Sequence, residues 1–353
     1  MINIINNILG YFSYDIGIDL GTANTLVYVE GKGIAIREPS VVARNKKTKE
    51  ILAIGGSAKK MLGRAPSTIE IIRPLRDGVI ADFDGAFAML DYYIKSVHES
   101  GGLIPKIPRP KVVIGIPSGV TEVERRAVAQ AAIASGARVV HLIEEPMAAA
   151  LGAGLKIEDA TGKFIVDIGG GTTEIAAVSM GGSVVSKSIK TAGDEIDEAI
   201  VNYAKLKYSL LIGLITAENV KINLGSAMDS KEEKEKTLKV KGRDLETGLP
   251  KAIKFSTTEV RDAIAPVVKI IVQSIKDTIE KCPPELVSDI MDEGIMLAGG
   301  GSLLKGIDKL IEKETEMKVF INDDPLTCVV RGCGVLLSNP NLLKKIKVTS
   351  GYK

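Results

Sequence analysis

Two short stretches of the chain each place an aspartate inside an apolar, strand-like run and follow it with glycine and threonine. Asp19 lies in DIGIDLGTANT, and Asp167 lies in FIVDIGGGTTE. A carboxylate buried in a strand is costly unless charges or hydrogen bonds compensate it. A divalent cation shared by the two aspartates would compensate both, because Mg²⁺ prefers oxygen ligands and needs only one or two carboxylates besides water.

The glycines and threonines beside these aspartates suit a phosphate chain. Glycine at a strand-turn-strand corner can adopt positive φ and expose consecutive backbone N–H groups, which form an anion site. Further donors are the hydroxyls of Thr22, Thr25, Thr172 and Thr173. We predict that the two corners hold one phosphate chain from opposite lobes, with Asp19 and Asp167 binding its cation directly or through water. The alternative is a pair of tight hairpins in which each aspartate caps its own turn.

A third glycine cluster, in LAGGGSLL, contains Gly299, Gly300, Gly301 and Ser302 between a predicted buried strand and a helix. Three glycines allow a flat base or a phosphate to approach the backbone closely. Without a ligand, the same residues would only turn the chain from strand to helix. The sequence has no GxxxxGKS/T motif and no GxGxxG fingerprint after a strand, so a P-loop is excluded and a Rossmann site is not predicted.

The sequence predicts the secondary structure that positions these corners. Strands are followed by helices, and this order occurs twice along the chain. The first half contains predicted strands at 16–20, 25–30, 33–38 and 111–117, and a hairpin with a charged turn at 45–50. Helical periodicity predicts a helix over 82–100, and Thr121 with Glu124 is a capping-box signature at the start of another. The strand-and-turn pattern then restarts at Phe164, so we predict a duplicated α/β protein with two lobes and a cleft between them.

Two features of the second half qualify that pattern. The charged run at 229–254 is typical of an exposed hairpin or loop. Pro266 lies inside a long helical pattern and is expected to kink it, because proline removes a backbone donor.

The composition is that of an ordinary globular protein. The 353 residues are 45% hydrophobic and 25% charged, and the net charge of +2 argues neither for nor against nucleic acid, which we do not predict as a partner. The three cysteines and two histidines lack metal-ligand spacing, which argues against a disulfide framework or structural zinc and favours a reducing compartment. No apolar run reaches the length of a membrane span and no secretory signal is present, so an intracellular protein is expected.

Both ends of the chain could contact a membrane surface. MINIINNILGYF has apolar residues at roughly helical spacing, and the tail LLKKIKVTSGYK is basic. Amphipathic and basic segments can hold a protein on an anionic bilayer. A poorly ordered N-terminus and a solvated tail explain the same residues equally well.

With these residues in view, the chain resembles a known superfamily. DIGIDLGTANT, IEEPMAAA, DIGGGTTE and LAGGGSLL are similar to the five-motif ATPase pattern shared by actin, sugar kinases and DnaK-type chaperones. Within that pattern the chain most resembles the MreB family of bacterial actins, through RPLRDGVIADFD, GVTEVERRAV and PPELVSDIMDEGIMLAGGGSLLKG. The resemblance runs from about Asp15 to about Leu343 and leaves out the two ends.

The resemblance implies the actin fold, an α/β architecture of two lobes, each with a ribonuclease-H-like core and a smaller inserted subdomain. On this basis 1–14 is an N-terminal extension. The first lobe is 15–147, with an insertion at about 37–73, and is completed by 321–343. The second lobe is 148–320, with an insertion at about 188–254, and 344–353 is a basic tail.

The resemblance also implies ATP or ADP with Mg²⁺ between the lobes. Asp19 and Asp167 would organise the water ligands of the metal. The residues expected to hold the phosphates are Gly21, Thr22, Ala23, Asn24, Gly169, Gly170, Gly171 and Thr172. Gly299, Gly300 and Gly301, followed by Ser302, would lie against the adenosine. Glu218 and Lys221 match family positions beside the ribose and base, and Asp194 is expected to reach toward the sugar.

ATP hydrolysis requires a residue that orients the attacking water, and two glutamates compete for this role. Glu124 is already explained as part of its capping box. Glu145 lies where a strand ends and a helix begins, and the family pattern places the catalytic acid there, with Thr172 as its helper. The alternative for Glu145 is stabilisation of a helix N-terminus, worth about 0.3–1 kcal/mol. Glu144 is expected to point elsewhere.

The resemblance implies an ATPase that assembles into filaments, as a homopolymer with paired antiparallel protofilaments. The alternative is a soluble actin-fold phosphotransferase resembling a sugar kinase, although no further motif offers its catalytic aspartate. A chaperone would need a substrate-binding domain that the pattern lacks. The expected location is the cytoplasm or the inner face of the cell membrane. Leu103 and Ile104, in GGLIPKIP, match an apolar pair that MreB-like proteins present to the bilayer, and the alternative is a buried loop anchor.

Overall fold

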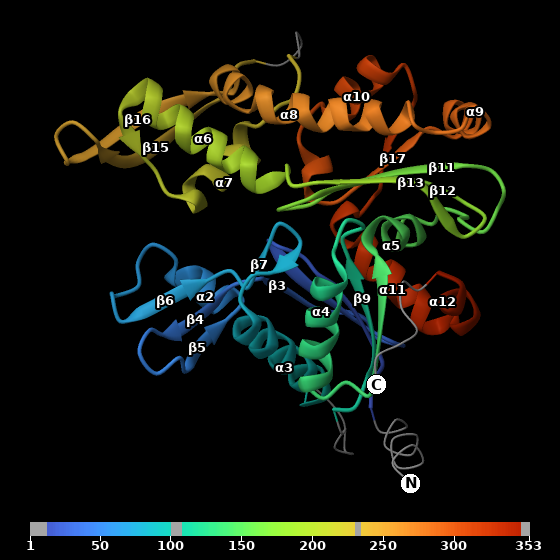
Figure 1. Ribbon diagram of the computed structural model, residues 1–353. Helices are drawn as coiled ribbons and strands as arrows, with labels where there is room; N and C mark the ends of the chain where they lie inside the picture. Colours follow the sequence, from blue (N-terminus) through green and yellow to red (C-terminus); the bar gives the residue numbers. More distant parts are fainter. Residues whose placement is uncertain (1–12, 100–107, 230–233, 347–353) are drawn as a thin grey trace.

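The computed structural model describes residues 13–99, 108–229 and 234–346, which form two lobes (Figure 1). The first lobe is built on a five-stranded sheet of order β10-β9-β1-β2-β3. Its strands are β1 (Ile16–Leu20), β2 (Asn24–Val29), β3 (Gly33–Pro39), β9 (Lys111–Ile116) and β10 (Val139–Glu144). The first three are antiparallel neighbours, while β1, β9 and β10 run parallel.

The second lobe repeats this arrangement in the order β13-β12-β11-β17-β18. Its strands are β11 (Lys163–Ile168), β12 (Thr173–Ser179), β13 (Gly182–Ile189), β17 (Ile295–Ala298) and β18 (Val319–Ile321). Strands β11, β12 and β13 are antiparallel neighbours, while β11, β17 and β18 run parallel. Each hairpin, β1–β2 and β11–β12, carries one aspartate-glycine corner at its turn. The predicted duplication is therefore present in the topology.

Helices cover the outer faces of both sheets. The first lobe has α3 (Phe83–Glu99) and α4 (Glu122–Ala134), whose N-terminus carries the predicted capping box of Thr121 and Glu124. The second lobe has α6 (Gly193–Tyr208), α7 (Leu214–Leu224), α8 (Thr257–Ile279), α9 (Pro284–Glu293) and α10 (Ile307–Thr315). Pro266 lies within α8, which continues without interruption to Ile279.

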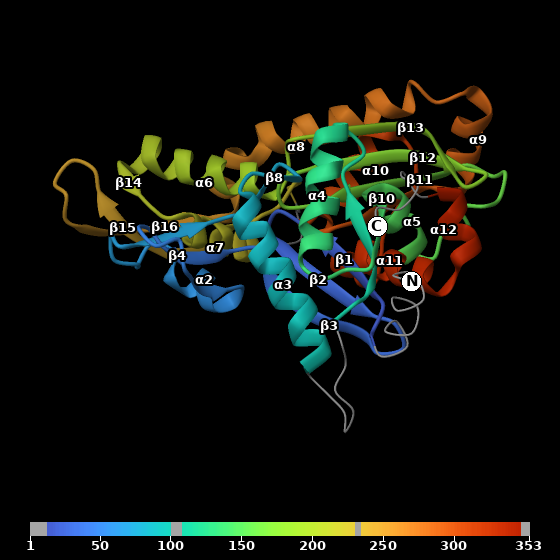
Figure 2. The ribbon, with the colours of Figure 1, turned by 60° about the horizontal axis from the view of Figure 1, so that its bottom comes forward.

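A smaller sheet extends each lobe, and both views place the two small sheets on the same side of the molecule (Figures 1 and 2). In the first lobe, β4 (Val42–Asn45), β5 (Ile51–Ile54) and β6 (Ile69–Ile72) accompany α2 (Gly56–Met61). In the second, β14 (Leu210–Leu211), β15 (Thr237–Asp244) and β16 (Pro250–Ser256) form a sheet, so the charged run is largely a hairpin as predicted. A short ribbon of β7 (Leu75–Arg76) and β8 (Val79–Ile80) joins β6 to α3.

Two helices, α5 (Glu145–Gly152) and α11 (Cys328–Ser338), cross between the two large sheets (Figure 1). A Cβ at Gly152 would lie 1.8 Å from the carbonyl oxygen of Cys328, and a Cβ at Gly332 would lie 1.9 Å from that of Ala148. Only glycine permits this approach, so the helices meet backbone to backbone. Apolar residues of both sheets and both helices form one core cluster here, joining the lobes.

The last described helix is α12 (Pro340–Ile346), so the first residues of the expected basic tail are helical and Ile346 is buried. In the described part of the chain, none of the helices combines the length and apolarity needed to cross a membrane. The other membrane-contact predictions, at 1–12, Leu103, Ile104 and 347–353, fall outside the described residues.

Candidate functional site

A cleft of about 630 Å³ separates the lobes, within the usual range for small-molecule sites. The predicted residues that line it are Asp19, Gly21, Thr22, Ala23, Asn24, Glu145, Asp167, Gly169, Gly170, Gly171, Thr172, Asp194, Glu218, Lys221, Gly299, Gly300 and Gly301. Ser302 does not line it. This side chain is fully buried and its hydroxyl donates to the Gly299 carbonyl at 2.6 Å. The strand ends and turns of both lobes therefore meet at one cavity.

The two aspartate-glycine corners touch each other directly. A Cβ at Gly170 would lie 2.6 Å from the Cβ of Ala23, and one at Gly171 would lie 2.7 Å from the hydroxyl of Thr22. The prediction that these corner glycines adopt positive φ is wrong, since Gly21 and Gly169–Gly171 all lie outside that region. Glycine is required instead because any side chain would collide with the opposite corner or with its own turn.

The second corner offers free donors to an anion. The N–H groups of Gly170 and Gly171 donate to no acceptor in the part of the chain that the structure describes. Two backbone hydrogen bonds from the start of α6 hold this turn in place. The N–H groups of Gly193 and Asp194 donate to the carbonyls of Gly169 and Gly170 at 3.2 and 2.7 Å. This rigid turn fits an oxyanion such as a phosphate.

Asp19 and Asp167 occupy corresponding positions at the ends of β1 and β11. Among the described residues, no lysine or arginine lies within ion-pair distance of either carboxylate. Burial raises the pKa of Asp19 to about 7. Burial, followed by the charges of Asp19 and Glu174, raises the pKa of Asp167 to about 8. Oxygen donors without a cation of their own fit Mg²⁺, directly or through water.

Glu145 is the first residue of α5 and is buried at the floor of the cleft. Burial raises its pKa well above the ordinary value, and the charges of Glu174, Asp19 and Asp167 add to the rise. A Cβ at Gly115 of β9 would lie 3.4 Å from the Cγ of Glu145, which is contact distance, so this strand lies directly beside the side chain. Its competitor Glu124 is held by Thr121 in the capping box, away from the cleft lining. Glu144 does not line the cleft either.

The third glycine cluster packs against the second corner. Gly299 adopts a φ of +79°, and a Cβ there would lie 2.3 Å from a carboxylate oxygen of Asp167. A Cβ at Gly301 would lie 2.2 Å from the Cγ2 of Ile168. These glycines therefore let the turn after β17 close over β11, in addition to lining the cleft.

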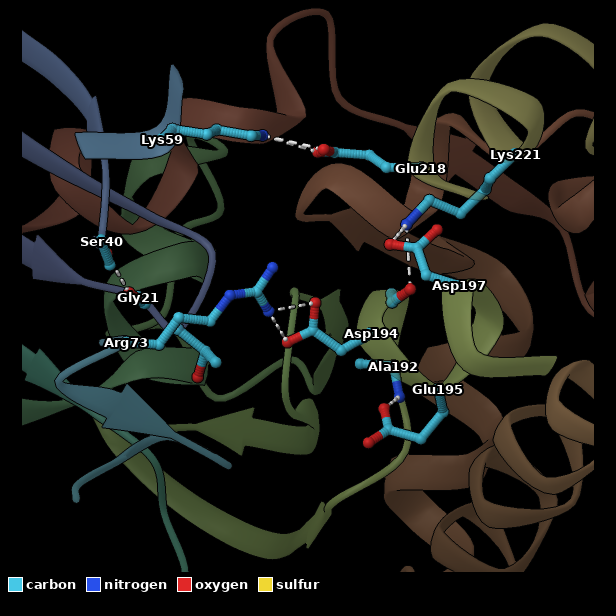
Figure 3. Close-up of polar contacts among 12 residues, drawn as sticks. Gly21, Ser40, Lys59, Arg73, Ala192, Asp194, Glu195, Asp197, Glu218 and Lys221 are labelled. Atoms are coloured by element: carbon cyan, nitrogen blue, oxygen red, sulfur yellow. Dashed lines mark hydrogen bonds and ion pairs between the residues drawn. The ribbon is translucent and has the colours of Figure 1, made fainter. Parts of the chain in front are cut away.

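Two ion pairs cross the cleft, and sequence analysis missed both of their cations (Figure 3). Lys59 of α2 lies 2.8 Å from Glu218 of α7, and Arg73, just after β6, lies 3.1 Å from Asp194 of α6. In this structure Glu218 and Asp194 are thus partnered by the first lobe. No local pattern marked Lys59 or Arg73, because their partners are more than a hundred residues away in the sequence.

Lys221 does not cross the cleft. Its ammonium group donates to Asp197 and to the Gly193 carbonyl, both at 2.9 Å, within the second lobe (Figure 3). Burial raises the pKa of Asp197 to about 6, although Lys221 opposes the rise. This pair fixes α7 against the start of α6 and so shapes one wall of the cleft.

Glu174 is a further buried carboxylate that sequence analysis did not select. It faces Asp167 across the β11–β12 pairing and accepts hydrogen bonds from Ser118 and Ser188. Burial raises its pKa, and these hydrogen bonds oppose the rise. Glu174 is the last residue of the motif DIGGGTTE. Nothing in the sequence distinguishes it from glutamates that are exposed on a strand.

The comparison with protein-family models decides the family. The model described as MreB/Mbl protein matches residues 13–345, which include both corners, Glu145 and the third glycine cluster. The chain belongs to the MreB/Mbl family. The resemblance in the motifs is thereby confirmed.

Individual MreB/Mbl relatives match over almost their whole length. The cell shape-determining protein MreB of Escherichia coli K12 is 48% identical over 332 residues, covering 93% of this chain and 94% of the relative. The cell shape-determining protein Mbl of Bacillus subtilis 168 is 46% identical over 338 residues, covering 96% of this chain and all of the relative. The crystal structure of MreB5 of Spiroplasma citri bound to ADP superimposes with a TM-score of 0.87 at 39% identity, covering 95% and 98% of the two chains.

These comparisons confirm the predicted actin-like fold and a cytoskeletal, actin-like protein of the MreB type.

Proposed function

We propose that this MreB/Mbl protein polymerises with bound Mg-ATP and hydrolyses the ATP slowly, so that hydrolysis limits the lifetime of the filament. The observation that carries this proposal is the pair of facing corners, where no described cation compensates the buried carboxylate of Asp167 or the partly buried one of Asp19. Solved structures of MreB5 of Spiroplasma citri carry ADP and AMPPNP, which supports the binding of a nucleotide. The cell-shape names of the relatives support a role in cell shape.

Each part of the cleft has a role in this proposal. The N–H groups and hydroxyls of the two corners bind the phosphates, and Gly299–Gly301 lie against the adenosine. Asp19 and Asp167 hold Mg²⁺, which supplies charge neutralisation on the phosphates when it is bound. Glu218 and Lys221 lie at the ribose and base, with Asp194 beside the sugar.

Glu145 orients the attacking water, with Thr172 as its partner from the opposite lobe. A water-orienting residue acts by position and by accepting a hydrogen bond, and Glu145 is buried and lines the cleft. Because its pKa is raised by burial and by three neighbouring carboxylates, a bound cation would favour its charged form.

The proposed partner is a second copy of the same chain, in paired protofilaments of the cytoplasm. The proposed membrane contact is with an anionic surface, through the ends of the chain and the segment around Leu103 and Ile104. No nucleic-acid partner is proposed.

High-speed sedimentation combined with phosphate release tests the proposal. The wild-type protein should pellet with Mg-ATP, remain in the supernatant without nucleotide, and release phosphate slowly. Glu145→Ala should still pellet with Mg-ATP but release phosphate about 100-fold more slowly. Absence of pelleting over a wide concentration range, with and without anionic vesicles, would favour a phosphotransferase instead.

A further inference from the structure

The carboxylate of Glu174 joins the two lobes behind the cleft. One of its oxygens accepts hydrogen bonds from the backbone N–H and the hydroxyl of Ser118, at 3.0 and 2.5 Å. The other accepts a hydrogen bond from the hydroxyl of Ser188, at 2.5 Å. Ser118 belongs to the first lobe, between β9 and α4, while Ser188 belongs to β13 of the second. One buried side chain therefore links both lobes.

This link lies beside the second corner. Glu174 is two residues beyond Thr172 on the same hairpin, and Pro117 precedes Ser118. A Cβ at Gly78 would lie 2.4 Å from Pro117 and 3.1 Å from the methyl group of Thr172, so these residues pack closely. A shift of Ser118 would therefore change the packing around Thr172.

Ser118, the first-lobe partner of Glu174, lies close to Glu145 through the pairing of β9 with β10. Ser118 follows the end of β9, which pairs in parallel with β10, so that Ile116 lies opposite Glu144. Glu145 is the next residue, and its Cγ lies in contact range of a Cβ built at Gly115. The strand that ends just before Ser118 thus also lies against the side chain of Glu145.

We propose that Glu174 is a positioning residue for ATP hydrolysis, because its hydrogen bonds to Ser118 and Ser188 fix Glu145 of the first lobe relative to Thr172 of the second. This inference rests on the proposed ATPase function. Glu174 does not line the cleft, so it acts through Ser118 and β9 and not by contact with the nucleotide. Small errors in the placement of reacting groups cost large factors in rate.

A pair of substitutions separates the hydrogen-bonded link from the charge. In Glu174→Gln, the amide oxygen can accept both bonds from Ser118, and the amide N–H can donate to the hydroxyl oxygen of Ser188. In Glu174→Ala all three bonds are lost. We expect single-turnover hydrolysis to fall about 10- to 100-fold in Glu174→Ala and to stay within about threefold of wild type in Glu174→Gln.

Nucleotide binding and thermal unfolding are measured on the same samples. The affinity for Mg-nucleotide should change by less than about threefold in both variants, since the phosphate corners remain intact. A purely structural role would lower the melting temperature without lowering the rate per folded, nucleotide-bound molecule. That result would overturn the inference, as would an equal loss of rate in Glu174→Gln and Glu174→Ala.

If Glu174→Ala does not fold, the double variant Ser118→Ala/Ser188→Ala provides the test. It keeps the glutamate and the Ser118 N–H bond but removes both hydroxyl donors, and we expect about a tenfold loss in hydrolysis. Unchanged hydrolysis in this variant would overturn the inference. An inactive wild-type protein would overturn the proposed function itself, and the inference with it.

Discussion

Arg73 and Asp194 join opposite walls of the cleft: one guanidinium nitrogen, Nη1, lies 3.1 Å from each carboxylate oxygen (Figure 3). Lys59 and Glu218 make a second crossing nearer the small subdomains. Because each pair takes one member from each lobe, opening of the cleft must break both of them.

We expect Arg73→Gln to speed the release of bound nucleotide. The pair is partly exposed, with side-chain exposures of 34% and 26%, so its loss should change the rate by about two- to fivefold. Stopped-flow release of a fluorescent nucleotide measures this effect, which should shrink at high salt as the charges are screened. Equal release from wild type and Arg73→Gln at low salt would contradict the prediction.

The stabilising effect of Mg-nucleotide should grow with pH. Without Mg-nucleotide, the folded state binds more protons than the unfolded state. The reason is that folding raises the pKa values of Asp19 and Asp167 from 3.8 to about 7 and about 8. The free energy of unfolding of the nucleotide-free protein should therefore decrease as the pH rises through this range. Bound Mg²⁺ favours the charged carboxylates and removes that loss.

Thermal unfolding at about pH 6 and about pH 8.5, with and without Mg-nucleotide, measures this difference. The increase in melting temperature should be larger at the higher pH. The variant Asp19→Asn/Asp167→Asn should show a weaker dependence, because its neutral side chains have no protons to release in this range. An equal increase at both pH values in the wild type would rule out these two aspartates as the linked groups.

Gly170→Ala should destabilise the fold because the new methyl group would meet Ala23 at 2.6 Å. Overpacking of this kind costs about 1–3 kcal/mol, which urea denaturation can measure. Ala23→Gly in the same chain should recover part of the loss by removing the opposing methyl group. Gly213→Ala is the matched control, since nothing lies within 4 Å of its added carbon. Additive effects of the Ala23 and Gly170 substitutions would show that the corners do not touch in solution.

The hydroxyl of Thr172, and not its methyl group, should be needed for hydrolysis. Thr172→Val keeps the packing against Gly78 and should reduce phosphate release about 10- to 100-fold. Thr172→Ser keeps the hydroxyl and should stay closer to wild type. If Thr172→Val hydrolyses ATP normally while Thr172→Ser is impaired, the residue acts by packing alone.

The fold and the floor of the cleft could be predicted because their signals are local. Asp19 and Asp167 stand out as charges inside apolar strands, and the glycines that follow each one mark a turn. Thr121 and Glu124 show a helix start within four residues, and the structure has their capping box. Motif resemblance then placed Glu145 in the cleft, where the structure also has it.

The contacts between the lobes could not be predicted, because their partners are distant in the sequence. In the sequence, Arg73 and Lys59 cannot be distinguished from ordinary surface cations. Only the folded structure shows that they pair with residues of α6 and α7. In the sequence, Glu174 also cannot be distinguished from other glutamates on strands. Its hydrogen bonds to Ser118 of the other lobe are visible only in the structure. The corner glycines were selected for the wrong reason, since positive φ is a local property, whereas the collision with Ala23 depends on how the two lobes meet.

The crossing of α5 and α11 determines how the lobes can move. At Gly152 and Gly332 the two backbones touch with no layer of side chains between them, so a sideways slide would drive peptide groups into one another. Rotation about the crossing point would avoid that collision, so we expect the lobes to move relative to each other mainly by rotation. In a polymer of such subunits, opening or closing the cleft would alter the twist from one subunit to the next more than their spacing along the axis.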